Sequence, residues 1–197
     1  MSLIGAVCVL AVAFLQTSQK ISNSNITSPP SSTSSQESQV SNHDSRLTTN
    51  YSVSTTNAFV SRVVDGDTLI AILDSEPGKE YRVRLLGINT PETVDPRKPV
   101  ECFGKHASAF TKKLLTGKRV SLAADPQADE MDKYGRLLRN VYLEDGTDVN
   151  ALLVKEGYAQ AYLSFPLDKD RKTQLRQLEQ EAKDNERGLW ALGICAN

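Results

Sequence analysis

The stretch FVSRVVDGDTLIAILDSEPGKEYRVRLL at residues 59–86 decides the fold of this chain. It holds three runs rich in β-branched and aromatic residues, which predict strands over Phe59–Val64, Thr68–Leu73 and Tyr81–Leu86. The runs are separated by DGD and by EPGK, and both separators have the composition of turns. The stretch is therefore predicted to form a three-stranded meander.

Helices and strands alternate after this meander. Apolar side chains in residues 103–114 recur at helical spacing, and Arg119–Ala124 and Arg136–Leu143 predict two more strands. A short helix capped by Asp148 and a longer helix over Lys169–Asn185 follow. This order favours a mainly β fold with α (the α+β class), namely a five-stranded OB-type Greek-key barrel with about three helices.

The chain of 197 residues divides by composition into three parts. Residues 1–15 carry the apolar run Leu3–Leu15, which is short for a membrane span and fits a signal peptide or a short N-terminal anchor. No Lys or Arg precedes this run, and a buried core helix is the alternative. Residues 16–57 are rich in Ser, Thr, Asn and Gln, which predicts a disordered linker. Residues 58–197 are left as one folded domain.

The composition disfavours several classes of function. The chain has two histidines, which is too few for most His-based zinc sites. His43 lies in the predicted linker and His106 lies off the apolar stripe of its helix, so a Ser-His-Asp triad is also disfavoured. A net charge of −1 argues against coating duplex nucleic acid by charge alone. A small site in which a few arginines meet one or two phosphates is still allowed.

Three polar clusters stand out from the apolar pattern. In Asp65-Gly66-Asp67-Thr68 two carboxylates flank a glycine, an arrangement that a plain hairpin turn also explains. Arg84 lies inside an apolar strand and needs an anionic partner, so either Glu92 neutralises it or the pair is available to a phosphate. Asp132-Lys133-Tyr134-Gly135-Arg136 is a charged turn that begins the fifth strand.

Together these clusters resemble the staphylococcal nuclease (thermonuclease) family over residues 60–190. The resemblance is carried by VVDGDT at 63–68, VRLLGINTPET at 83–93, FGKHASAFTKKLL at 103–115, DKYGR at 132–136 and GLW at 188–190. It implies a nuclease that hydrolyses phosphodiester bonds of DNA and RNA with little sequence specificity and leaves 3′-phosphates. It also implies a monomer without a small-molecule cofactor, which prefers single-stranded or frayed nucleic acid.

The resemblance implies three catalytic residues, Arg84, Glu92 and Arg136. The chemistry agrees, because phosphodiester hydrolysis builds negative charge on the phosphate oxygens and two guanidinium groups can hold that charge. Glu92 follows a rigid Thr-Pro and can position or deprotonate the attacking water. A pure binding module need not retain this set, and a non-catalytic OB-type module that binds nucleic acid or protein is the alternative function.

The resemblance further implies one Ca²⁺ ion, held by Asp67, Asn89 and the backbone carbonyl of Thr90. These are oxygen ligands, which calcium prefers. The family usually has an aspartate where this chain has Asn89, so one negative charge is missing from the ligand set. We therefore expect weak calcium binding that strengthens when a substrate phosphate is present.

Substrate contacts are also implied by the resemblance. Lys133 and Tyr134 match positions that contact the terminal phosphate of the nucleotide. Tyr162 matches a tyrosine that packs near the nucleotide, with an aromatic lid over the barrel as the alternative.

The cysteines bear on the cellular compartment. Of three cysteines, Cys8 leaves with the signal peptide if it is cleaved, so Cys102 and Cys195 form an even pair. We expect these two to form a disulfide in an oxidising compartment, with two free thiols as the alternative. The expected location is secreted or cell-envelope, with membrane anchoring through the apolar N-terminus as a variant.

Overall fold

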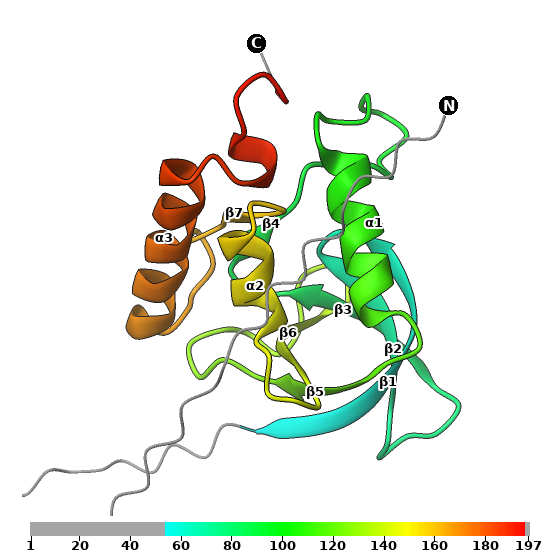
Figure 1. Ribbon diagram of the computed structural model, residues 1–197. Coiled ribbons are helices and arrows are strands. Elements are labelled where there is room, and N and C mark those ends of the chain that lie inside the picture. Colours follow the sequence, from blue (N-terminus) through cyan, green and yellow to red (C-terminus); the bar gives the residue numbers. More distant parts are fainter. Residues whose placement is uncertain (1–53, 196–197) are drawn as a thin grey trace, which may run out of the picture. The chain divides into compact units, whose positions relative to one another are not determined.

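The computed structural model describes residues 54–195 (Figure 1). The signal peptide or anchor predicted for residues 1–15 lies outside the described residues, as does most of the linker predicted for residues 16–57. Among the helices of residues 54–195, none is both long and apolar enough to span a membrane.

Five strands close into a barrel, as the sequence predicts. They are β1 (Thr55–Asp65), β2 (Thr68–Leu73), β3 (Glu80–Leu85), β5 (Arg119–Ala123) and β6 (Leu137–Leu143). The strand order is β1-β2-β3-β6-β5, and the pairing of β1 with β5 closes the barrel. Neighbouring strands are antiparallel except β3 and β6, which run parallel. The predicted OB-type α+β class is confirmed.

The predicted linker boundary at residue 57 is wrong, because β1 already begins at Thr55. Residues Thr55, Thr56 and Asn57 pair with Ala123, Leu122 and Ser121 of β5. Their polar side chains have the composition of the linker that precedes them. Their backbone groups, however, satisfy the hydrogen bonds of β5, and this pairing is what closes the barrel.

Three α-helices cover the barrel: α1 (Gly104–Leu115), α2 (Val149–Lys155) and α3 (Lys169–Asp184). Helix α1 packs against β1, and α2 lies between β6 and α3 (Figure 1). The predicted cap of α2 is confirmed, because the Asp148 carboxylate accepts the N–H of Ala151 at 2.9 Å. Two short pieces, β4 (Ile88–Asn89) and β7 (Gln160–Ala161), pair with each other.

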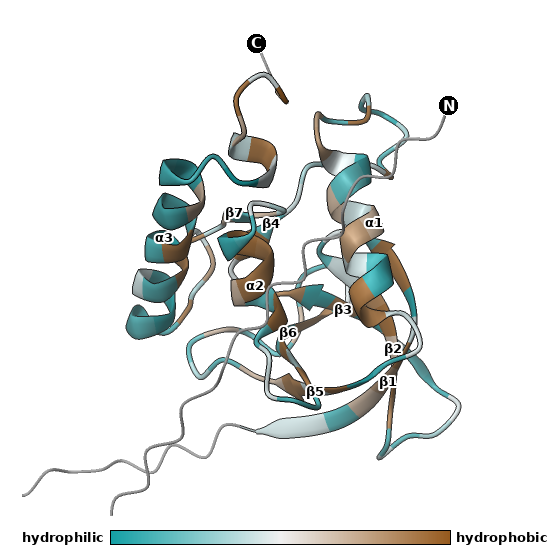
Figure 2. Cartoon of the chain, viewed as in Figure 1, coloured by the Kyte–Doolittle hydropathy of each residue, from teal (hydrophilic) through white to brown (hydrophobic). Residues whose placement is uncertain are grey.

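The core lies inside the barrel and beneath the helices. Figure 2 shows apolar residues concentrated on the strands and α2, whereas most of α3 is hydrophilic. Helix α3 therefore attaches through few side chains, chiefly the buried Leu175 and Ala182. Burying a leucine contributes about 1.5–3 kcal/mol, so a narrow apolar stripe is enough to hold the helix in place.

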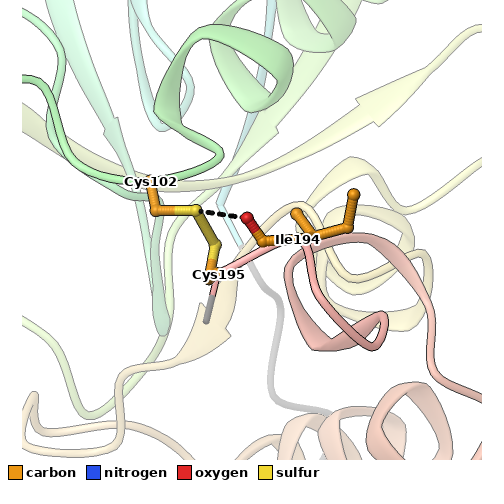
Figure 3. Close-up of a disulfide and its surroundings, with 3 residues drawn as sticks. All are labelled: Cys102, Ile194 and Cys195. Carbon is orange, nitrogen blue, oxygen red and sulfur yellow. Dashed lines mark hydrogen bonds between the residues drawn. A yellow bond between two sulfur atoms is a disulfide. The ribbon is translucent and has the colours of Figure 1, made fainter. Parts of the chain in front are cut away.

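The C-terminal segment returns to the start of α1. After α3 the short 3₁₀ helix η1 (Gly188–Trp190) leads to Cys195, which forms a disulfide with Cys102 (Figure 3). The predicted pairing of these two cysteines is confirmed. The link joins residues 93 positions apart in the sequence, so it closes a loop that holds α1 and every element after it.

Candidate active site

A polar pocket of about 270 Å³ lies where β1, β2, β3 and the segment after β4 meet. It brings together all the residues that the sequence analysis assigned to catalysis and to the metal. These residues are Asp67, Arg84, Asn89, Thr90, Glu92 and Arg136. The first and the last of them, Asp67 and Arg136, are 69 residues apart in the chain, so the barrel topology is what assembles them.

Arg84 forms the buried part of the pocket. It lies on β3 with 6% of its surface exposed, and its Nη2 lies 3.1 Å from Asp67 Oδ2. It also donates to Asn89 Oδ1 at 3.2 Å and to the Leu85 carbonyl at 2.7 Å. Burial lowers the pKa of Arg84, while the Asp67 charge acts in the opposite direction. The guanidinium is thus held in a fixed orientation.

The structure corrects the expected partner of Arg84. The sequence analysis considered Glu92 as the group that neutralises it, but Asp67 has that role. The reason is register: Arg84 is opposite Thr68 in the β2–β3 ladder, which brings the preceding residue, Asp67, to its side. The Glu92 carboxylate is instead bound by backbone N–H groups.

The Glu92 carboxylate is held by the backbone of its own loop. Its Oε1 accepts the N–H groups of Thr93, Val94 and Asp95 at 2.9, 2.7 and 3.1 Å. The bond from Val94, with those from the other two amides, lowers the pKa of Glu92 below its ordinary value although burial opposes this. The carboxylate is therefore ionised at neutral pH, and it is better suited to orienting a water molecule than to strong base catalysis.

Asp65 connects the end of β1 to the same loop. It accepts the Thr93 hydroxyl at 2.6 Å and the Gly66 N–H at 2.8 Å. Burial raises the pKa of Asp65, with the nearby Asp67 charge as a smaller contribution in the same direction. The glycine between the two aspartates is required, because a Cβ at Gly66 would lie 2.7 Å from the Thr90 side chain. The predicted hairpin turn is thus also part of the site.

The predicted calcium ligands are oxygen atoms, which suit a hard cation. Asp67 Oδ2 accepts the Thr90 N–H at 3.0 Å and faces Arg84, as does Asn89 Oδ1. The Thr90 hydroxyl is buried without a hydrogen-bond partner among residues 54–195. In the same range, no three His, Cys, Asp or Glu side chains form a metal-binding group. The predicted set contains one carboxylate, one amide and one carbonyl, so its oxygens fit calcium with little negative charge.

The three predicted substrate contacts line a neighbouring pocket of about 460 Å³. Lys133, Tyr134 and Tyr162 lie there, and Arg136 lines both pockets. Tyr134 is highly exposed, with the Lys133 ammonium 5.1 Å and the Arg136 guanidinium 5.4 Å from its ring centre. Tyr162 is exposed and meets Phe165 edge-on at 5.1 Å. The second pocket therefore offers aromatic faces directly beside the arginine.

Sequence reasoning missed further residues of the polar pocket. Arg82, Lys98 and Glu101 also line it. Lys98 and Glu101 are exposed and lie in the irregular segment before α1, where no periodic pattern distinguishes them from ordinary surface charges. Arg82 alternates with Arg84 along β3, which was the available sequence signal.

A closed five-stranded barrel with three arginines and several carboxylates in one small pocket is typical of an OB-type phosphodiester hydrolase. The family model described as "Staphylococcal nuclease homologue" matches residues 82–192. The chain belongs to this family. It is therefore a nuclease, an enzyme that hydrolyses phosphodiester bonds of nucleic acid.

Individual relatives agree with this assignment. The chain is 47% identical to the thermonuclease of Staphylococcus intermedius, over 66% of this chain and 74% of the relative. It is 41% identical to the thermonuclease of Staphylococcus hyicus, over 67% of this chain and 74% of the relative. It is 38% identical to "Endonuclease YncB" of Bacillus subtilis, over 67% of this chain and 60% of the relative.

Proposed function

We propose that this protein is an extracytoplasmic, calcium-dependent nuclease that cleaves DNA and RNA with little sequence preference and leaves 3′-phosphates. One observation carries the proposal: Arg84, Arg136 and Glu92 line a single pocket together with the oxygen-bearing residues Asp67, Asn89 and Thr90. We assign catalysis to Arg84, Glu92 and Arg136. A pocket used only for binding would not need a carboxylate beside two phosphate-binding arginines.

The two arginines bind the phosphate from different elements. Arg84 is fixed in β3, and Arg136 immediately precedes β6, where Asp132 accepts its Nε–H at 2.7 Å. Each guanidinium offers paired N–H donors to the oxygens on which charge accumulates during attack. Asp67, Asn89 and the Thr90 carbonyl would hold the calcium ion, which when bound neutralises phosphate charge. Arg84 exchanges part of its bonding to Asp67 and Asn89 for the phosphate.

Glu92 orients the attacking water. Its carboxylate accepts a hydrogen bond from the water and directs the water oxygen at phosphorus. A weak base can accept the water proton only as the new P–O bond forms, because the attacking water becomes acidic at that point. The bond from phosphorus to the 5′-oxygen breaks. The 5′-oxygen takes a proton from solvent and leaves as a 5′-hydroxyl, and the other fragment retains a 3′-phosphate.

The second pocket supports a preference for single strands. Tyr134, Tyr162 and Phe165 provide aromatic surface that an unpaired base can stack on, and Lys133 adds a positive charge. Bases inside a duplex are already stacked and cannot reach such a surface. We therefore infer that single-stranded or frayed nucleic acid is the preferred substrate of a monomeric enzyme.

Two features support a location outside the cytoplasm. The apolar run Leu3–Leu15 has the length of a signal-peptide core. The disulfide between Cys102 and Cys195 is of a kind that persists in oxidising compartments. Fractionation of producing cells should find the oxidised protein in the medium or the envelope. Recovery from the cytosol with two free thiols in the folded domain would contradict this location.

The experiment that tests the proposed function is digestion of single-stranded DNA and RNA. Purified oxidised protein is incubated with calcium, with other divalent metals, and with a chelator, and the ends of the products are analysed. We expect cleavage with calcium, none with chelator, and phosphate on the 3′ ends. Binding without cleavage under every divalent metal would instead establish the non-catalytic module, and cleavage in chelator would disprove the metal requirement.

A further inference from the structure

Glu101, a residue outside the assigned catalytic set, closes the loop that carries Glu92. We call the point where Glu92 and Glu101 meet the neck of this loop. The N–H of Glu92 donates to Glu101 Oε2 at 2.9 Å, and the N–H of Glu101 donates to the Glu92 carbonyl at 2.9 Å. These two bonds join the ends of the segment 92–101. The N–H groups that hold the Glu92 carboxylate all belong to the same segment. The position of the catalytic carboxylate therefore depends on this closure.

The neck is tied to the far end of the chain by the disulfide. Cys102 directly follows Glu101 and is bonded to Cys195, and its Sγ lies 3.1 Å from the Ile194 carbonyl oxygen (Figure 3). A disulfide sulfur has no proton, so this approach is a sulfur–oxygen contact. The residue Cys102 is exposed. A dissolved thiol can therefore reach the bond.

Close packing transmits the position of the neck to Glu92. A Cβ at Gly104 would lie 3.1 Å from the Glu92 carbonyl oxygen and 2.7 Å from the Thr93 side chain. The first residue of α1 thus lies against the backbone of the catalytic loop. Displacement of the Cys102 segment therefore moves the backbone that carries Glu92.

We propose that Glu101 is a positioning residue for Glu92 and that the disulfide secures it, so that turnover depends on the thiol redox state. This inference rests on the proposed function. A dithiol supplies two electrons and two protons, the protein disulfide becomes two thiols, and the dithiol becomes a disulfide. The barrel still holds Arg84, so the reduced protein binds phosphate but orients water poorly. The loss falls on kcat and not on KM.

The negative charge of Glu101, taken alone, predicts a different effect of Glu101→Ala on KM and kcat. Glu101 lines the pocket, so its negative charge opposes an incoming phosphate. If only this charge mattered, Glu101→Ala would lower KM and leave kcat unchanged. If Glu101 positions Glu92, Glu101→Ala lowers kcat by about ten-fold to a hundred-fold, the range expected for a small misplacement of a catalytic group.

The matched control is Glu101→Gln. The glutamine amide oxygen still accepts the Glu92 N–H, so this variant loses the charge but retains the hydrogen bond. We expect Glu101→Gln to recover most of the wild-type kcat. Equal losses in the two variants, or no loss in either, would overturn the positioning role. Both are assayed well below their unfolding midpoints, so that loss of fold does not enter the comparison.

The redox arm uses the whole oxidised protein and the double variant Cys102→Ser/Cys195→Ser. A dithiol should lower the kcat of the wild type reversibly and leave the double variant, already slow, unaffected. An unchanged kcat in the reduced wild type would overturn the role of the disulfide.

Hydrogen exchange of the Glu92 amide gives a readout that does not need activity. Protection should fall in Glu101→Ala and on reduction, and should persist in Glu101→Gln. An inactive wild type with this exchange pattern would refute the proposed function but leave the positioning role of Glu101 intact. An active wild type without this exchange pattern would refute only the claim that Glu101 and the disulfide position Glu92.

Discussion

Arg84 and Glu92 lie in the same pocket, yet one is buried in the barrel and the other stands on a partly exposed loop. Arg84 and its partner Asp67, the barrel half of the site, are fixed by strand register and by an ion pair with little exposure on either side. Glu92 and Glu101, the loop half, are fixed by backbone hydrogen bonds and by the neighbouring disulfide.

The pocket thus holds one functional group by strand register and an ion pair, and the other by the backbone of a loop. In the barrel half, stability and chemistry depend on the same contacts, so one substitution changes both. In the loop half, Glu92 and Glu101 make few core contacts, so a substitution of either side chain can remove chemistry while the disulfide and the fold persist.

Removal of the disulfide should have the largest effect on stability. A link across 93 residues restricts the unfolded chain and contributes about 4–5 kcal/mol in the loop-entropy account. We expect the double variant Cys102→Ser/Cys195→Ser to unfold at clearly lower denaturant than the oxidised wild type. The measurement is chemical unfolding followed by Trp190 fluorescence and by circular dichroism. Equal midpoints would show that the unfolded chain gains nothing from release of the link.

Arg84→Ala should damage both stability and catalysis. It leaves the Asp67 charge buried without its partner, which costs about 3–4 kcal/mol. It also removes a phosphate contact, which should lower the cleavage rate by about 10²–10³. The control is Arg62→Ala, an exposed arginine on β1 outside the pocket, which should change neither quantity. Loss of activity with unchanged stability would show that stability and chemistry do not depend on the same contacts in the barrel half.

Much of this barrel half could be predicted from the sequence. Runs of β-branched and aromatic residues with turn residues between them predicted the strands, and the family resemblance carried by the DGDT and RLLGINTPE motifs pointed to Asp67, Arg84 and Asn89. The pairing of Arg84 with Asp67 depends on the β2–β3 register, which local patterns do not specify. The pocket-lining position of Lys98 and Glu101 likewise depends on how an irregular segment folds back. The early start of β1 depends on β5, which lies far along the chain.

Asn89→Asp should have a smaller effect, chiefly on metal binding. The substitution adds one negative charge to the oxygen ligands, and calcium affinity rises with ligand charge. We expect calcium to bind the variant about ten-fold more tightly in the absence of substrate, a change of about 1.4 kcal/mol. Calorimetric calcium titration of both proteins, with and without a nucleotide bisphosphate, measures this change. Identical affinities would show that Asn89 is not a calcium ligand.

The most direct test of the account is the single-turnover cleavage rate of Glu92→Gln at saturating calcium and DNA, measured together with its unfolding midpoint. The glutamine oxygen can still accept the N–H groups of Thr93, Val94 and Asp95, so the loop retains its shape while the charge is lost. We expect a rate lower by about 10²–10³ with an unchanged midpoint, because the carboxylate orients the water and contributes little to the fold. A rate within a few-fold of the wild type would contradict the assignment of Glu92, and with it the claim that this pocket is the active site.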